Sequence, residues 1–224
     1  MISNINLNKK AYIVEFVAII LFTVLITIAM FTYGGGTKYE LTNPGYSFWG
    51  NTFSDLGRTT SYNGESNLIS MILFSISYLG ISFGFIPFYY VFPGLFNKKT
   101  LQRRSSIIGS IFGLLSSIGF VGVVLTPADL LRPPHMIIAI IAYACIFFMG
   151  VFYSLSIFKS EKFPISYFFL FAVFSVVFFI TLMMQLGGEI INNRVMAVTG
   201  QKIGRIAIFI SFSILTYKSW RLEK

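Results

Sequence analysis

The chain has 224 residues, of which 55% are hydrophobic and 11% charged, and its mean hydropathy is +0.77. This composition excludes a soluble domain, whose surface would have to be largely polar, and predicts a polytopic membrane protein. The formal charge of +9 does not indicate nucleic-acid binding, because Lys and Arg occur in short clusters beside apolar runs, as membrane topology signals do. We therefore expect membrane lipids as partners and no nucleic acid.

The sequence predicts an all-α membrane bundle of six transmembrane helices that forms a single domain over residues 1–224. Each apolar run is long enough to cross a bilayer, since roughly 20 helical residues span the hydrocarbon core. The expected spans are residues 12–33, 67–92, 105–125, 134–158, 165–186 and 200–217. The first run is interpreted as an anchored span, because it exceeds the apolar stretch of about 7 to 15 residues in a signal peptide. Glu15 is expected in its first turn, near the membrane interface.

The distribution of basic residues predicts that both termini are cytoplasmic. With this orientation, 11 of the 17 Lys and Arg residues fall on the inner side, which follows the positive-inside rule. These are Lys9, Lys10, Lys98, Lys99, Arg103, Arg104, Lys159, Lys162, Lys218, Arg221 and Lys224. We expect the protein in the cell membrane, with its inner loops acting only as anchors.

The longest polar interval, from Tyr46 to Asn67, precedes the second span, and most of the chemically active side chains share its outer side. The candidate catalytic residues are Asp55, Asp129 and His135. The candidate binding residues are Ser54, Arg58, Asn67, Arg132, Glu189, Gln201 and Arg205. Two interpretations remain open for this group: a solvated surface with structural ion pairs, or an outward-facing polar pocket between helices.

Several of these residues also have a plain structural explanation. Asp55 suits a turn that bonds its own backbone, and Asp129 suits a cap on a short link between two spans. His135, in the first turn of the fourth span, suits a hydrogen-bonded residue near a helix N-terminus. The chain has a single cysteine, a single histidine and no Gly-rich phosphate loop, HExxH or GxSxG motif. We expect neither a metal nor a cofactor.

Arg205 is expected inside the sixth span, on the same face as Gln201 four residues earlier. A lipid-facing cation at that depth would be costly, so we expect it to point into the protein and to pair with a carboxylate. Asp55 and Glu189 are the predicted partners, with Asp55 favoured.

The chain resembles the DUF 998 family of six-span prokaryotic membrane proteins, which is similar in layout to Frag and DRAM-like proteins. The resemblance rests on FSDLG before a helix that opens at Asn67, on a short outer link with Asp129 and His135, and on Gly200, Gln201 and Arg205 at the last span. It implies a six-span fold and a link to lipids. It also implies functional positions at Ser54, Asp55, Gly57, Asn67, Asp129, His135 and Arg205.

Three functions are compatible with the sequence. The favoured hypothesis is a protein that binds or senses lipid or has a structural role, with the outer charges forming a polar network. The first alternative is a lipid-modifying enzyme in which Asp129 or Asp55 works with His135 as acid and base. The second alternative is a small-solute transporter. A hydrogen bond between Asp129 and His135 in an open cavity would favour the enzyme.

Overall fold

The structure is a computed structural model that describes residues 2–158 and 160–223, with side chains from Leu7 onward. Its described residues contain no β-strand, only an isolated bridge between Thr60 and Ser66. The helices are α1 (Ile2–Phe31), α2 (Phe53–Leu56), α3 (Leu68–Gly84), α4 (Ile86–Val91), the 3-10 helix η1 (Phe92–Leu95), α5 (Leu101–Leu125), α6 (Arg132–Ile157), α7 (Ile165–Ile190) and α8 (Arg194–Leu222).

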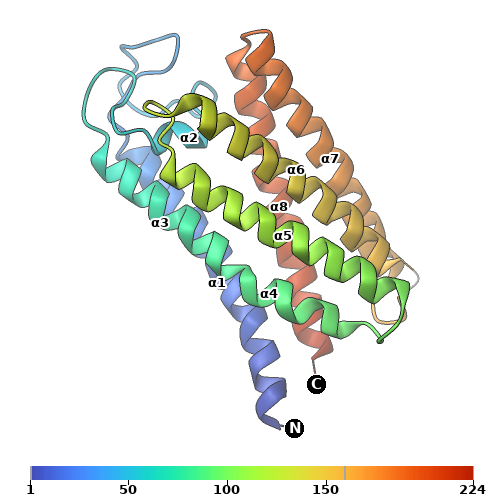
Figure 1. The fold of residues 1–224 in the computed structure, drawn as a ribbon. Helices are drawn as coiled ribbons and strands as arrows, with labels where there is room; N and C mark the ends of the chain where they lie inside the picture. Colours follow the sequence, from blue (N-terminus) through green and yellow to red (C-terminus); the bar gives the residue numbers. More distant parts are fainter. Residues whose placement is uncertain (1, 159, 224) are drawn as a thin grey trace.

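Six helical segments are long and apolar enough to cross a membrane, which confirms the predicted all-α bundle. The second of them consists of α3, α4 and η1 in succession. The helix is interrupted after Gly84, because Pro87 lies in the first turn of α4. Consecutive spans pack on one another, and α8 returns to α1, so that the six spans form a closed bundle (Figure 1). In α8, 56% of the most apolar stretch is buried, against at most 39% in the other spans.

Several predicted boundaries are wrong because helices continue past the apolar runs. The helix α1 begins at Ile2, so Glu15 is not in its first turn; its side chain is fully buried, with 0% exposed. The expected fifth span ends at residue 186, but α7 continues through Gly187 and Gly188 to Ile190. The helix α8 begins at Arg194, where the side chain of Asn193 caps it by accepting a hydrogen bond from the Met196 amide at 3.1 Å.

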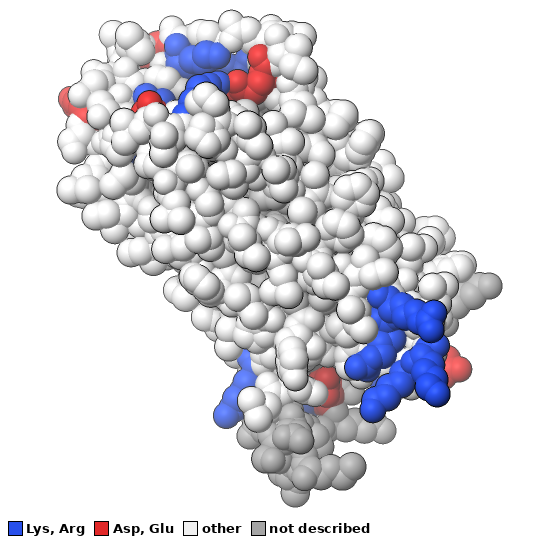
Figure 2. All heavy atoms as spheres, viewed as in Figure 1, with Lys and Arg blue, Asp and Glu red and all other residues white. Residues whose placement is uncertain are grey.

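The first and last described residues, Ile2 and Glu223, lie at the same end of the bundle, called here the terminal end, together with the connections 96–100 and 160–164 (Figure 1). The long segment 32–67 and the turns 126–131 and 191–193 lie at the opposite end, called here the loop end. On the face drawn in Figure 2, charged side chains gather at both ends, with an uncharged surface band between them. Lys159 and Lys224, two of the basic residues expected on the inner side, fall outside the described residues.

Candidate functional site

The segment 32–67 folds back into the loop end of the bundle and places the short helix α2 among the spans. Thr52 and Asp55 cap this helix reciprocally: the Asp55 amide donates to Thr52 Oγ1 at 3.2 Å, and the Thr52 amide donates to Asp55 Oδ2 at 2.7 Å. The Phe53 amide donates to Gln201 Oε1 at 2.6 Å, which ties α2 to α8. Asp55 is therefore held at a fixed position inside the bundle, with 3% of its surface exposed.

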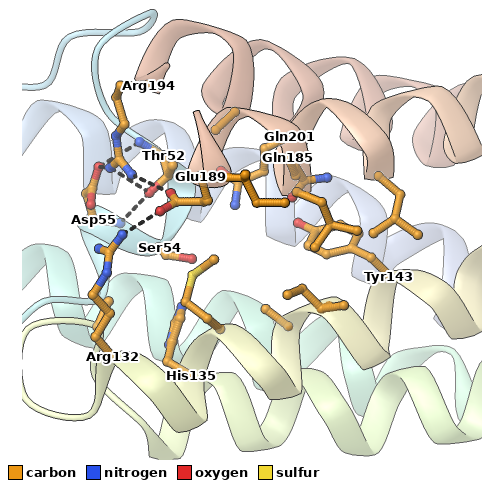
Figure 3. A pocket seen from close by; sticks show the side chains of 18 residues that line it. Thr52, Ser54, Asp55, Arg132, His135, Tyr143, Gln185, Glu189, Arg194 and Gln201 are labelled. Carbon is orange, nitrogen blue, oxygen red and sulfur yellow. Dashed lines mark hydrogen bonds and ion pairs between the residues drawn. The ribbon is translucent and has the colours of Figure 1, made fainter. Parts of the chain in front are cut away.

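Four charged side chains of alternating sign form a continuous network at this position (Figure 3). Asp55 Oδ2 lies 2.5 Å from Nη2 of Arg194, and both side chains are buried. Arg194 also lies 3.5 Å from Glu189, and Glu189 lies 2.6 Å from Arg132. Burial decreases along this chain of contacts: 5% of the Arg194 side chain is exposed, 25% of Glu189 and 42% of Arg132. The network thus runs from a buried ion pair to an exposed one.

A cavity of about 250 Å³ lies beside this network, between α2, α6, α7 and α8 (Figure 3). Its polar wall carries the four charged residues as well as Ser54, His135, Gln185 and Gln201. Its apolar wall is formed by α6 and α7, with Ala139, Ile140, Leu182 and Leu186 among its members. Ile190, another lining residue, is 83% exposed, so the cavity reaches the surface of the bundle at the loop end.

His135 lines the cavity and is oriented by the backbone. Its Nδ1 lies 2.6 Å from the Thr126 carbonyl oxygen, which can only accept, so Nδ1 carries the hydrogen. In the neutral ring, Nε2 is then the basic nitrogen. His135 is only 2% exposed, and its ring lies among the cavity side chains of α6 (Figure 3).

Asp129 has a different role. Its carboxylate accepts hydrogen bonds from the Thr59 amide at 3.0 Å, the Thr59 hydroxyl at 2.6 Å and the Thr60 amide at 3.0 Å. Burial alone would raise the pKa of this carboxyl, but these hydrogen bonds outweigh it and lower the pKa below its usual value. Asp129 does not line the cavity and does not bond to His135. It joins the turn 126–131 to the segment 32–67.

Six of the ten candidate residues line the cavity, and four do not. Those that line it are Ser54, Asp55, Arg132, His135, Glu189 and Gln201. Among the others, the Arg58 Nε donates to the Thr60 carbonyl oxygen at 3.0 Å, and the guanidinium lies 4.0 Å from the Tyr62 ring centroid. The side-chain amide Nδ2 of Asn67 donates to the carbonyl oxygens of Leu56 at 3.0 Å and Arg58 at 2.9 Å, so this side chain shapes the backbone around α2.

Arg205 points into the protein, as predicted, but its predicted pairing with Asp55 or Glu189 is wrong. Asp55 and Glu189 are both paired with arginines nearer the loop end. Arg205 instead donates to the hydroxyl oxygens of Tyr78 at 2.8 Å and Tyr143 at 3.4 Å. Because α8 begins at Arg194, Arg205 lies about 16 Å along the helix, deeper than the sequence boundaries implied.

Aromatic rings complete the surroundings of Arg205. Its guanidinium carbon lies 4.9 Å from the ring centroid of Phe22, 5.1 Å from that of Tyr78 and 5.2 Å from that of Phe120. Such contacts stabilise a desolvated cation through the negative face of the ring. Tyr143 also lines the cavity, so it connects the surroundings of Arg205 to the cavity wall.

Three further residues that shape this site were not predicted from the sequence. Arg194 lies before the expected sixth span, which begins at residue 200, although Asn193 is a good N-cap signal for a longer α8. Gln185 was included in the apolar fifth span without being considered for the site, yet it lines the cavity. Lys202 is 1% exposed; its Nζ bonds to the Tyr46 hydroxyl and lies 3.6 Å from the Phe53 ring centroid. Lys202 therefore fixes the segment 32–67 onto α8.

Comparisons of this chain with protein-family models, with curated proteins and with solved structures give no significant match.

Proposed function

We propose that this multi-pass membrane protein binds a membrane lipid in the cavity between α6, α7 and α8. The main support for the proposal is the cavity itself, which has charged side chains at its entrance and an apolar wall. It lies in a bundle of six helices that are long and apolar enough to span a membrane. Pockets that enclose a drug-sized ligand measure roughly 300 to 1,000 Å³. A cavity of about 250 Å³ suits a lipid head group and the first part of its chains. The remaining chain length would lie outside, along α6 and α7.

The charges at the mouth favour a zwitterionic phospholipid. Arg132 and Glu189 are the exposed members of the network, and an exposed ion pair contributes only about 0 to 1 kcal/mol. A head group with one phosphate and one ammonium would replace this pair, with its phosphate on Arg132 and its ammonium on Glu189. Asp55 and Arg194 remain paired behind them, because separating a buried ion pair is costly.

The enzyme alternative loses its predicted acid–base pair in this geometry. Asp129 is bonded to Thr59 and Thr60, outside the cavity, and Asp55 is bonded to Arg194. In the described part of the chain, no carboxylate forms a hydrogen bond or ion pair with the His135 ring. A binding role is therefore the better supported one.

Filling the cavity is expected to lower lipid binding. Ala139→Phe places a ring in the apolar wall, and we expect the affinity for a zwitterionic phospholipid to fall about tenfold, equivalent to about 1.4 kcal/mol. Native mass spectrometry of the detergent-purified protein with added zwitterionic or anionic phospholipid measures this. The control is Ile137→Phe, on the same helix at a 59% exposed position outside the cavity. Equal lipid retention in both variants would contradict the proposal.

We also propose that the terminal end faces the cytoplasm and that the protein resides in the cell membrane, following the basic residues near the helix ends. In a Cys145→Ala background, an impermeant thiol reagent applied to intact cells is expected to label Glu65→Cys, at the loop end, and not Lys98→Cys, at the terminal end. Both positions are exposed, so accessibility differs only by membrane side. Labelling of Lys98→Cys but not of Glu65→Cys would show that the terminal end faces outward, opposite to the proposal.

A further inference from the structure

A second polar cluster lies between α1 and α8, toward the terminal end and away from the lipid cavity. It consists of Tyr12 and Glu15 on α1 and of Thr216 and Ser219 on α8, each pair three residues apart and therefore on one helix face. All four are buried, with at most 2% exposed. Glu15 lies about 12 Å along the helix from Leu7, where the candidate span begins, so it is well inside the membrane region.

Few oxygen atoms of this cluster are satisfied by the described residues. Both carboxylate oxygens of Glu15, the Tyr12 hydroxyl, the Thr216 Oγ1 and the Ser219 Oγ are buried without a well-formed hydrogen bond, although the Thr216 hydroxyl is near enough to Glu15 to interact with it. Buried polar atoms in native proteins nearly always have a partner, so five such atoms in one place require an explanation. A carboxylate together with hydroxyl oxygens is a ligand set for a hard cation.

No positive charge of the protein compensates Glu15 in the described residues. It forms no ion pair with a described Lys or Arg. The titratable groups that interact with it are the phenols of Tyr12 on its own helix and of Tyr89 and Tyr153 on neighbouring helices, and Tyr12 also interacts with the Glu223 carboxylate. The packed helices α3 and α4 contain no charged residue. An ionised carboxylate in such surroundings is costly unless a cation joins it.

A cavity at the surface of the bundle adjoins the cluster. A cavity of about 150 Å³ is lined by Tyr12, Thr216, Ile13, Tyr217 and Trp220 together with Phe16. Tyr12 and Thr216 belong to both the cavity wall and the cluster, whereas Ile13 and Tyr217 are 51% and 60% exposed. The cluster therefore borders the cavity through Tyr12 and Thr216.

From this geometry we infer that Glu15, Tyr12, Thr216 and Ser219 form a binding site for a small monovalent cation, either a proton or a sodium ion, which exchanges through the adjacent cavity. The inference does not depend on the proposed lipid site, which lies at the other end of the bundle. A proton makes the carboxyl neutral, and its O–H then donates to a hydroxyl oxygen. A sodium ion leaves the carboxylate ionised and takes the hydroxyl oxygens as further ligands.

Infrared spectroscopy of the carboxyl C=O stretch tests this inference on the full chain in detergent. In sodium-free buffer at neutral or lower pH, we expect a band from a buried carboxylic acid that is absent in Glu15→Gln. The matched control is Glu161→Gln, which removes an exposed carboxyl near the same end and should keep the band. Raising the pH should remove the band reversibly, with an unchanged far-ultraviolet circular dichroism spectrum. If sodium chloride, but not choline chloride, also removes it at fixed pH, the site takes sodium; otherwise it takes a proton.

A second variant keeps the test informative if Glu15→Gln does not fold. Thr216→Val retains the acid and removes one ligand oxygen, so the midpoint of the band titration should shift by up to about one pH unit, a tenfold change in affinity. Two outcomes would overturn the inference. One is the absence of a Glu15 band at every pH in sodium-free buffer. The other is a band that neither pH nor salt changes before the protein unfolds, which would make Glu15 a permanently neutral structural acid.

Discussion

Replacing Asp55 by asparagine is expected to destabilise the folded protein by about 3 to 5 kcal/mol, because it leaves the Arg194 guanidinium buried without its carboxylate. The two side chains are 4% and 5% exposed and lie 2.5 Å apart. Asparagine keeps the shape of aspartate and an acceptor oxygen for the Thr52 amide, so the loss reports mainly on the missing charge. The free energy of unfolding in detergent, measured by chemical denaturation, checks this result.

A double-mutant cycle identifies the partner. Asp55→Asn combined with Arg194→Gln should cost less than the sum of the single changes, because no charge is then left unpaired. Arg132→Gln is the control: it removes an arginine from the same network, but that side chain is 42% exposed, and we expect a loss below about 1 kcal/mol. Additive effects of the Asp55 and Arg194 changes would contradict the pairing.

The fold was predictable because hydropathy alone separates membrane-spanning helices from connections. All six predicted spans overlap the six long apolar segments of the structure. The boundaries were less predictable where polar residues continue a helix. The expected sixth span begins at residue 200, yet α8 begins at Arg194. A buried partner for Arg194 makes a helical start favourable there, and such a partner is not visible in local sequence.

The site was predictable as a group of residues but not as a set of contacts. Asp55, Arg132 and Glu189 were expected near one another, and they share one network. Their pairing depends on how far α8 extends and how it is rotated, and this decides that Arg194, not Arg205, meets Asp55. Helix extent and rotation also explain the burial of Glu15. Because α1 begins at Ile2 and turns this side chain toward α8, a residue expected at the membrane interface is buried.

The second large effect is expected at Gly188, where α7 and α8 come close together beside Glu189. A Cβ atom added there would lie 2.6 Å from the Ala197 amide nitrogen and 2.8 Å from the Asn193 carbonyl oxygen. Both are backbone atoms at the start of α8, so they move only if the two helices separate. We expect Gly188→Ala to destabilise the protein by about 1 to 3 kcal/mol or more. Displacing the start of α8 should also weaken lipid retention, since Arg194 moves with it.

Gly187→Ala is the matched control for this change, because it alters the adjacent position of the same helix in the same way. The nearest atom to its added Cβ is the terminal methyl carbon of Met196 at 3.2 Å, which a flexible side chain can move aside. Alanine is also favoured over glycine inside a helix by about 0.5 to 1 kcal/mol. We therefore expect Gly187→Ala to be neutral or slightly stabilising in thermal unfolding, with normal lipid retention in native mass spectrometry. Equal stability of the two variants would mean that α7 and α8 do not approach closely at Gly188, and that the start of α8 is free to adjust beside the cavity.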